Sequence, residues 1–304
     1  MTIATTVPSP ASSVVLANLA CMGSMLVWAI GFPLADALLA VLPPVTVTML
    51  RLVHATAFLL PLRYILDGWQ SVRGARWDRG LVVGAIGMGG GSLLLIYGQS
   101  RTDGVTTAVI AATMPIVGIA LECLLDGRRL TARIVLGILL SFAGGGAVYA
   151  ARMGHLNLGL GALATLGSTI IFTWASRASV TALPGLSALG RTAVTIAGGM
   201  FLVVAVQAVL PALGGQPVPW HLIGAREWSY AAAYGAASMA LSQILFLIGV
   251  AGLGIGIAAM HTNVAPFYVM LFALAFGDSW SWPSAFAATL VLAGVILAQT
   301  RPRA

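Results

Sequence analysis

Long apolar runs, separated by short polar or glycine-rich stretches, divide this chain. The apolar residues follow one another continuously instead of alternating with polar ones, so the pattern predicts helices and excludes a transmembrane β-barrel. A helix that crosses a bilayer needs about 20 mostly apolar residues. This criterion predicts an all-α membrane protein with ten transmembrane helices, which are called spans one to ten in chain order. The spans are predicted at residues 14–32, 44–62, 80–99, 104–125, 132–150, 159–179, 186–210, 228–250, 254–276 and 284–300.

The composition supports a membrane location. Of 304 residues, 59% are hydrophobic and only 8% are charged. A soluble domain carries about 25% charged residues because its surface faces water, and a disordered chain is richer still in charge. Both classes are therefore excluded, and we expect the lipid bilayer to surround most of the protein.

The charged residues predict an orientation. The 15 basic residues are all arginines, and they lie scattered between apolar runs, which excludes the clustered basic face of a nucleic-acid-binding protein. If the N-terminus is cytoplasmic, inner segments hold Arg63, Arg73, Arg76, Arg79, Arg128, Arg129, Arg133, Arg177, Arg301 and Arg303. The outer loops then hold only Arg101, Arg152 and Arg226. Because cytoplasmic segments carry the excess of Arg and Lys, we expect both termini in the cytoplasm.

Motifs that recur in the same order in both halves of the chain predict an internal repeat. The matched positions lie between 140 (Pro44 to Pro184) and 151 (Pro115 to Pro266) residues apart. They are Pro115 and Pro266, Gly127 and Gly277, Pro44-x6-Arg51 and Pro184-x6-Arg191, and Trp28-Ala29 and Trp174-Ala175.

Each predicted half contains five spans, and this odd number determines how the halves are related. Two equivalent halves with five spans each must lie upside down relative to one another, as in many secondary transporters. We expect repeats at 14–150 and 159–300, a connecting loop at 151–158, and cytoplasmic tails at 1–13 and 301–304.

Four stretches resemble the drug/metabolite transporter superfamily in its ten-helix, EamA-type form. They are VWAIGF at 27–32, the Pro-x6-Arg of span two, ATMPIVGIALECLLDGRRLT at 112–131 and NVAPFYVMLFALAFGD at 263–278. Such proteins often carry Glu after the glycine that closes span four, whereas this chain has Arg128 there. Within the superfamily the chain is most similar to bacterial aromatic amino acid exporters. The resemblance implies a monomeric transporter of the bacterial inner membrane, without a cofactor, that moves amino acids outward.

Polar, aromatic and proline residues within the spans are the candidates for a substrate site between the repeats. Proline frees backbone carbonyls within a helix, and polar groups inside a membrane are costly enough to need a reason. For each candidate, helix packing remains an alternative to substrate binding. The candidates are Trp28, Tyr97, Met114, Pro115, Trp174, Ser238, Ser242, Gln243, His261, Asn263 and Pro266.

Arg51 and Arg191 lie within spans two and seven at matched positions. Arg51 could meet a substrate carboxylate, but the recurrence favours a structural role for both, in which they cap carbonyls or extend towards the interface. The chain shows no nucleophile with its base and no His, Asp and Glu cluster at metal spacing, so it predicts neither an enzyme nor a metal site.

The sequence therefore predicts a secondary transporter that exports amino acids, aromatic or hydrophobic ones in particular, by alternating access. Export of drugs or other metabolites by the same fold is one alternative. A receptor-like or scaffold subunit that transports nothing is another. No span has a central Asp or Glu, which favours exchange or facilitated export over a proton relay through carboxylates.

Overall fold

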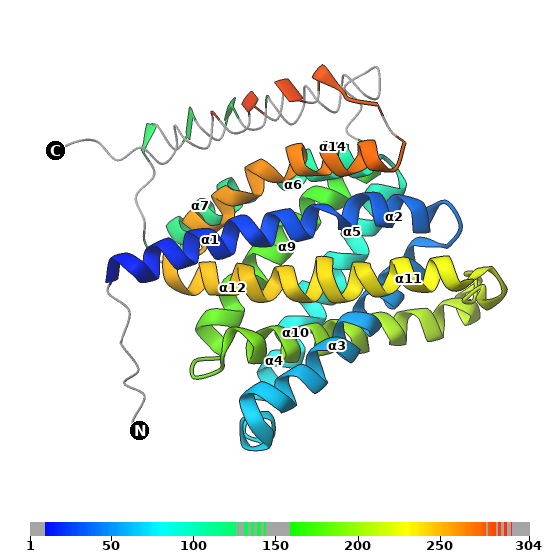
Figure 1. Ribbon diagram of the computed structural model, residues 1–304, viewed down its shortest axis with the longest axis horizontal. Coiled ribbons are helices and arrows are strands. Elements are labelled where there is room, and N and C mark those ends of the chain that lie inside the picture. The colour runs from blue at the N-terminus through cyan, green and yellow to red at the C-terminus, as the bar shows by residue number, and fades with distance from the viewer. Residues whose placement is uncertain are drawn as a thin grey trace.

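The computed structural model describes residues 10–125 and 159–277, together with scattered positions within 127–143 and 279–293, and all of its described elements are helices (Figure 1). In the first half they are α1 (Pro10–Ala29), α2 (Gly31–Leu39), α3 (Pro44–Arg73), α4 (Trp77–Gly84), η1 (Ala85–Gly90), α5 (Gly91–Ser100), α6 (Gly104–Ala111) and α7 (Met114–Leu125). In the second half they are α9 (Leu160–Ala182), α10 (Ala188–Val209), η2 (Leu210–Leu213), η3 (Trp220–Leu222), α11 (Ala225–Ala233), η4 (Tyr234–Leu241), α12 (Ser242–Leu253), α13 (Ile255–Ala258), η5 (Ala259–Val264) and α14 (Ala265–Ala275).

Seven stretches of helix among the described residues are long and apolar enough to cross a membrane. They correspond to the predicted spans one to four and seven to nine: Val14–Leu39, Pro44–Arg73, Trp77–Ser100, Gly104–Leu125, Ala188–Leu213, Ala225–Leu253 and Ile255–Ala275. The predicted span six is the helix α9, which is not among these seven. Most of the predicted spans five and ten lies outside the described residues, as do the predicted tails and connecting loop, so the number ten remains a prediction.

Two helices continue well beyond their predicted ends. The first span reaches Leu39 because Ile30, between α1 and α2, keeps a helical backbone despite the glycine and proline that follow it. The second reaches Arg73 after a sharp turn at Gly68, where φ is 77°. The Arg63 side chain is fully buried and its Nη2 donates to the carbonyl of Ser71 at 3.0 Å, which ties the turn to the helix. A charged residue therefore did not mark the end of this helix.

The same local irregularities occur in corresponding spans of the two halves. Spans three and eight each contain a π-helical segment, η1 and η4. Spans four and nine are each interrupted just before their proline, by a turn at residues 112–113 and by the 3₁₀ segment η5. The matched glycines that follow these spans, Gly127 and Gly277, both have positive φ. The repeated motifs therefore adopt repeated backbone conformations.

Helices at corresponding positions in the two halves of the chain also pack against corresponding partners. Helix α1 packs on α12, and correspondingly α9 packs on α5. Helix α3 packs on η4, and correspondingly α10 packs on η1 and α4. The corresponding helices α3 and α10 pack on each other, as do α7 and α13. Exchanging spans one to four for spans six to nine therefore leaves this set of packed pairs unchanged.

Glycine permits the closest of these approaches. A Cβ atom on Gly84 in α4 would overlap the backbone carbonyl of Thr195 in α10, and one on Gly198 would overlap the backbone of Leu81. Helix pairs in membranes approach closely where such small residues face each other. Spans three and seven therefore pack backbone against backbone.

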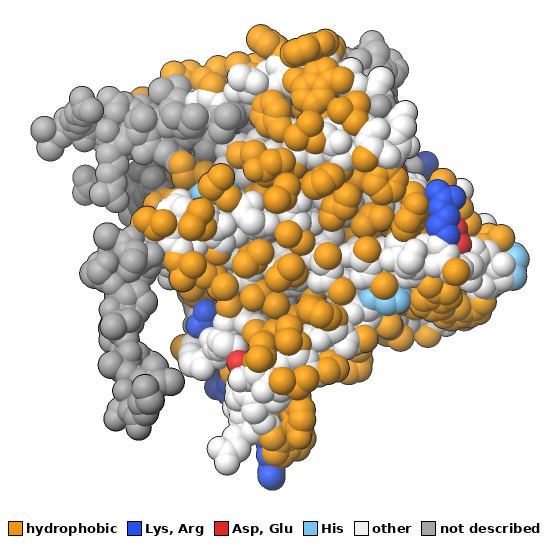
Figure 2. Space-filling view, viewed as in Figure 1, with side chains coloured by type: hydrophobic (Ala, Val, Ile, Leu, Met, Phe, Trp, Pro, Cys, Tyr) orange, Lys and Arg blue, Asp and Glu red, His pale blue; other side chains and the backbone are white. Residues whose placement is uncertain are grey.

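The outer surface is suited to lipid. Large apolar side chains such as Leu19, Phe58, Phe201 and Leu271 are exposed. Figure 2 shows a broad apolar face on which Arg, Asp and Glu side chains appear towards the edges. An apolar surface of this extent is stable only in contact with lipid or with another protein.

Candidate functional site

A cavity with an empty volume of about 630 Å³, counting space open to solvent, lies among helices from both halves of the chain. Its wall takes residues from α1, α3, α5, α6 and α7 and from α9, η4, α12 and η5. The lining residues are Ser24, Met25, Trp28, Arg51, Gly91, Ser92, Leu95, Ala111, Met114, Ser168, Thr169, Phe172, Met239, Ser242, Gln243, Phe246 and Thr262.

The irregular segments of the spans border this cavity. The π segments η1 and η4 end immediately before Gly91 and Ser242, and the residues that follow them line the wall. A π segment adds a residue to a helical turn and so rotates the side chains that follow it relative to a regular α-helix. Met114 and Thr262 lie at the interruptions of spans four and nine. The repeated irregularities therefore direct side chains from both halves towards one space.

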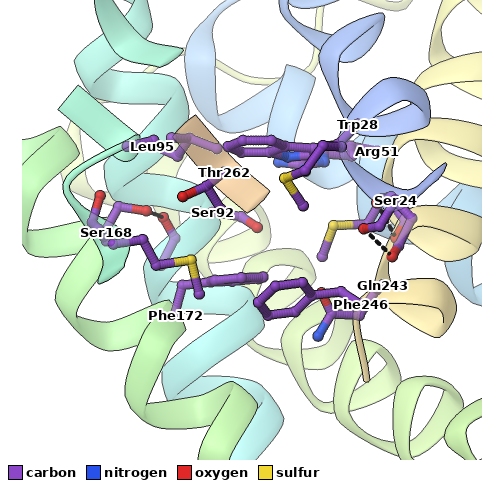
Figure 3. A pocket seen from close by; sticks show the side chains of 17 residues that line it. Ser24, Trp28, Arg51, Ser92, Leu95, Ser168, Phe172, Gln243, Phe246 and Thr262 are labelled. Carbon is purple, nitrogen blue, oxygen red and sulfur yellow. Dashed lines mark hydrogen bonds between the residues drawn. The ribbon is translucent and has the colours of Figure 1, made fainter. Parts of the chain in front are cut away.

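Aromatic side chains form two opposite walls (Figure 3). Trp28 lies on one side and also meets the ring of Phe32 edge-on, with ring centroids 4.9 Å apart. Phe172 and Phe246 lie on the other side, with centroids 6.3 Å apart and ring planes tilted by 33°. Aliphatic and sulfur-containing side chains, those of Met25, Leu95, Ala111, Met114 and Met239, make up much of the remaining apolar lining. The cavity can therefore accept a flat apolar group between Trp28 and the two phenylalanines.

Arg51 lines the same cavity and is the most unusual residue in it. Its side chain is only 3% exposed, and its Nε and Nη1 have no hydrogen-bond partner among the described residues. The guanidinium carbon lies 4.5 Å from the centroid of the Tyr234 ring, a cation–π contact, and Arg51 forms no ion pair with any described carboxylate. A buried charge without a partner is costly, so this arginine favours an anion that enters the cavity.

The other polar groups of the wall are mostly engaged. Ser24 Oγ donates to the carbonyl of Ser242 at 2.7 Å, and Ser168 Oγ donates to the carbonyl of Gly91 at 2.7 Å. Thr169, Ser242 and Thr262 likewise donate to backbone carbonyls. Apart from Arg51, the buried lining atom without a partner is Nε2 of Gln243. The unpaired buried atoms of these two side chains are therefore hydrogen-bond donors, and the amide oxygen of Gln243 is an acceptor.

The structure brings five of the predicted candidates to the cavity wall: Trp28, Met114, Ser242, Gln243 and, from the pair expected to be structural, Arg51. Ser238 borders a smaller adjoining pocket of about 150 Å³, and its Oγ donates to the carbonyl of Trp28 at 3.0 Å. Pro115 and Pro266 are buried at the starts of α7 and α14 without lining the cavity. Arg191 also lies outside the wall, and its Nε donates to the carbonyl of Leu183 at 3.2 Å.

The remaining candidates lie elsewhere. Tyr97 is covered by the guanidinium of Arg101, whose central carbon is 5.2 Å from the ring centroid. Trp174 packs against a buried apolar cluster. His261 has Nδ1 3.3 Å from the carbonyl of Ala258, and Asn263 is buried with both amide atoms unpaired, but neither lines the cavity.

Several lining residues escaped sequence reasoning, above all Phe172, Phe246, Ser24 and Thr169. Phe172 lies two positions before Trp174, so a search of the helix turn around each candidate would have found it. Phe246 follows Gln243 by three positions and shares its helix face. Tyr234, which stacks on Arg51, begins η4 and carried no signal of its own.

Comparison with known proteins points to a membrane transporter. A sequence model described as "EamA-like transporter family" matches residues 15–149, which supports the resemblance to the drug/metabolite transporter superfamily. A solved structure described only as "Crystal structure of protein" shares 22% sequence identity with this chain, at a TM-score of 0.70 over 93% of this chain and 96% of the other. At that identity the likeness shows the fold alone. No curated protein matches the chain. Together with the seven apolar helices, these matches support a multi-pass membrane protein.

Proposed function

We propose that this chain is a secondary transporter that exports amino acids, aromatic or hydrophobic ones in particular, across the bacterial inner membrane by alternating access. The observation that carries the proposal is Arg51, a buried and unpaired cation in a cavity with aromatic walls. A guanidinium can donate two parallel hydrogen bonds to a carboxylate. The substrate's side chain would then lie between Trp28 and the rings of Phe172 and Phe246.

The helix packing supports two inverted repeats. The packed pairs stay the same when the helices of one half are exchanged for those of the other, as a two-fold axis requires. With five spans in each half, that axis lies in the membrane plane and the cavity lies where the halves meet. We propose that both termini are cytoplasmic and that the transporter works as a monomer.

Two carboxylates hold the first turns of spans four and nine. Asp36 Oδ2 accepts the backbone N–H of Gly104 at 3.0 Å, and Glu122 Oε1 accepts that of Gly256 at 2.9 Å. In the inverted arrangement these contacts lie at opposite membrane faces. We propose that they break alternately, while spans four and nine bend at the interruptions before Pro115 and Pro266.

The coupling proposed is exchange or facilitated export without a carboxylate relay. The described lining includes no Asp or Glu that could carry a proton across with the substrate. Proteoliposomes loaded with a pH-sensitive dye measure this directly. A luminal pH change in step with amino acid flux would contradict the proposal.

Uptake of radiolabelled phenylalanine, leucine and alanine into proteoliposomes tests the transport proposal. We expect phenylalanine to move fastest, and we expect Arg51→Gln to abolish that flux while Arg191→Gln preserves it. Export of other metabolites predicts flux of non-amino-acid substrates only. A receptor or scaffold predicts binding without flux, and no flux of any amino acid above that of protein-free vesicles would refute the exporter.

A further inference from the structure

The described wall of the cavity carries a positive charge and no negative one, and this imbalance affects which substrates can bind. Among the described lining residues there is one cation, Arg51, and no Asp or Glu. An amino acid at neutral pH brings both a carboxylate and an ammonium group, and this wall offers a counter-charge only to the first. The guanidinium of arginine stays protonated in proteins, so the wall keeps its positive charge throughout the cycle.

From this imbalance we propose that the preferred substrate class is aromatic monocarboxylates that carry no ammonium group, in preference to the zwitterionic amino acids of the same shape. The inference rests on the proposed function, because it takes the cavity to be the transport site and Arg51 to bind the carboxylate. It keeps the site, the carboxylate contact and the aromatic group of that proposal, and replaces the neutral zwitterion by a net anion that balances the charge of the wall.

An ammonium group would find only neutral acceptors among the described lining residues. The hydroxyls of Ser24, Ser168 and Thr262 donate to backbone carbonyls, and their oxygens, like Oε1 of Gln243, offer an ammonium group lone pairs but no negative charge. The unpaired buried atoms of the wall, on Arg51 and Gln243, are donors, which an ammonium cannot use. Transfer of an ionised group from water to such a site is costly unless it is paired.

Nearby acidic groups are already engaged outside the cavity. Asp36 accepts from Gln99 Nε2 at 2.8 Å and from the N–H of Gly104 at 3.0 Å. Glu122 accepts from the N–H of Gly256 at 2.9 Å. Neither lines the cavity. An ammonium group in the cavity would therefore find no carboxylate partner among the described lining residues.

The rest of the wall suits the remainder of such an anion. The carboxylate would meet Arg51 and the Gln243 amide, which together supply three unpaired buried nitrogens. The aryl group would lie between Trp28 and the ring pair of Phe172 and Phe246, which Figure 3 places across the cavity. No part of a 3-phenylpropionate-like anion is then left without a matching surface.

Four ligands with one phenyl group and one chain length separate the two charges. They are 3-phenylpropionate, L-phenylalanine, L-phenylalaninamide and 3-phenylpropanamide. At pH 7 a carboxyl group is ionised and an amino group is mostly protonated, so their net charges are about −1, 0, +1 and 0 in that order. Affinities would be measured by calorimetry on the whole chain in detergent at pH 7, because the acid form of 3-phenylpropionate crosses lipid unaided. We expect 3-phenylpropionate to bind about tenfold or more tightly than phenylalanine, since an unpaired buried charge costs at least that much.

The variant Arg51→Gln tests whether the charge of Arg51 causes this preference, because the expected change in affinity differs in sign between anionic and cationic ligands. We expect it to weaken 3-phenylpropionate and phenylalanine, to leave neutral 3-phenylpropanamide unchanged, and to strengthen cationic phenylalaninamide. Unchanged binding of 3-phenylpropanamide also verifies that the variant is folded. The matched variant Arg191→Gln should change none of the four affinities.

The outcomes distinguish this inference from the proposed function. If phenylalanine binds as tightly as 3-phenylpropionate or more tightly, and both depend on Arg51, the amino acid exporter stands and the inference is refuted. If neither carboxylate binds to the wild-type chain, or neither depends on Arg51, the carboxylate site itself is refuted. A preference for 3-phenylpropionate that disappears in Arg51→Gln supports the inference and the carboxylate site at Arg51, and makes amino acids the weaker substrates of that site.

Discussion

Arg51 and Arg191 occupy the same place in the same motif, but their surroundings in the folded chain are different. Each follows a proline by seven residues near the start of spans two and seven. Arg51 lines the cavity and is buried against Tyr234 with two unpaired nitrogens, whereas Arg191 is half-buried and bonds the carbonyl of Leu183. Two copies of one sequence motif can therefore lie in similar helices while their side chains have different roles, because the role depends on neighbouring helices.

The largest difference is expected between the two arginine variants, in their substrate flux. Arg51→Gln should lower the initial flux of labelled substrate by about 100-fold, because truncating one partner of a buried charge pair costs about 2–5 kcal/mol. Arg191→Gln should stay within about twofold of wild type, since Arg191 lies outside the cavity and its bond to the Leu183 carbonyl stabilises the fold, by about 1 kcal/mol, and not the bound substrate. Proteoliposome uptake at matched protein density measures both. Equal losses in the two variants would refute the distinction.

The two matched tryptophans give the next largest difference. Trp28→Ala should weaken substrate binding by about tenfold, because it removes one apolar wall, and a buried aromatic contributes about 1.5–3 kcal/mol. Trp174→Ala, outside the cavity and packed in the core, should lower the unfolding temperature in detergent without weakening binding. Calorimetry and thermal unfolding on the same preparations separate these effects. A loss of affinity in Trp174→Ala at unchanged stability would contradict the assignment.

A smaller difference in substrate affinity is expected between variants of two buried amide residues, Gln243 and Asn263. Gln243→Ala should weaken carboxylate binding by about fivefold, because one net hydrogen bond is worth about 1 kcal/mol. Asn263→Ala should leave binding unchanged and the fold as stable or more stable, since both amide atoms are unpaired in the native structure. Substrate titrations and thermal unfolding distinguish them. If Asn263→Ala has the larger effect on affinity, the site extends to span nine beyond Thr262.

The smallest change in affinity is expected from variants of Tyr234, whose ring stacks against the guanidinium of Arg51. Tyr234→Leu should weaken carboxylate binding by about threefold, because it removes a cation–π contact worth about 0.5–2 kcal/mol. Tyr234→Phe keeps the ring face and should bind as wild type does. The pair is measured by calorimetry with 3-phenylpropionate. Equal weakening in both variants would assign the effect to the hydroxyl instead of the ring.

Much of the fold was predictable because lipid imposes a simple condition on a chain. The helices predicted for spans one to four and seven to nine were confirmed as long apolar helices, although two ends were placed too early. The error at Arg63 is instructive. An arginine that can bond a carbonyl across its own turn is tolerated inside a helical segment, so charge alone does not locate a helix end.

The candidate site was less predictable, for a different physical reason. Trp28, Met114, Ser242 and Gln243 were named from residue type and position, and the structure places them on one wall. Tyr97, Trp174 and His261 have equally suitable side chains but lie elsewhere. Which face of a helix meets the cavity depends on its rotation, and the π segments η1 and η4 shift that rotation without any local sequence signal that we recognised.

The sequence by itself determined that this chain enters a membrane as apolar helices and that its halves share one pattern, because both properties follow from side chains in linear order. Only the tertiary structure decided which of two equivalent arginines remains unpaired and which polar groups of the wall remain free. Those properties depend on whether a carbonyl or a carboxylate from a distant span comes within bonding distance. Within the described part of the chain, no such group comes within bonding distance of Nε or Nη1 of Arg51. The proposed substrate site depends on this missing partner.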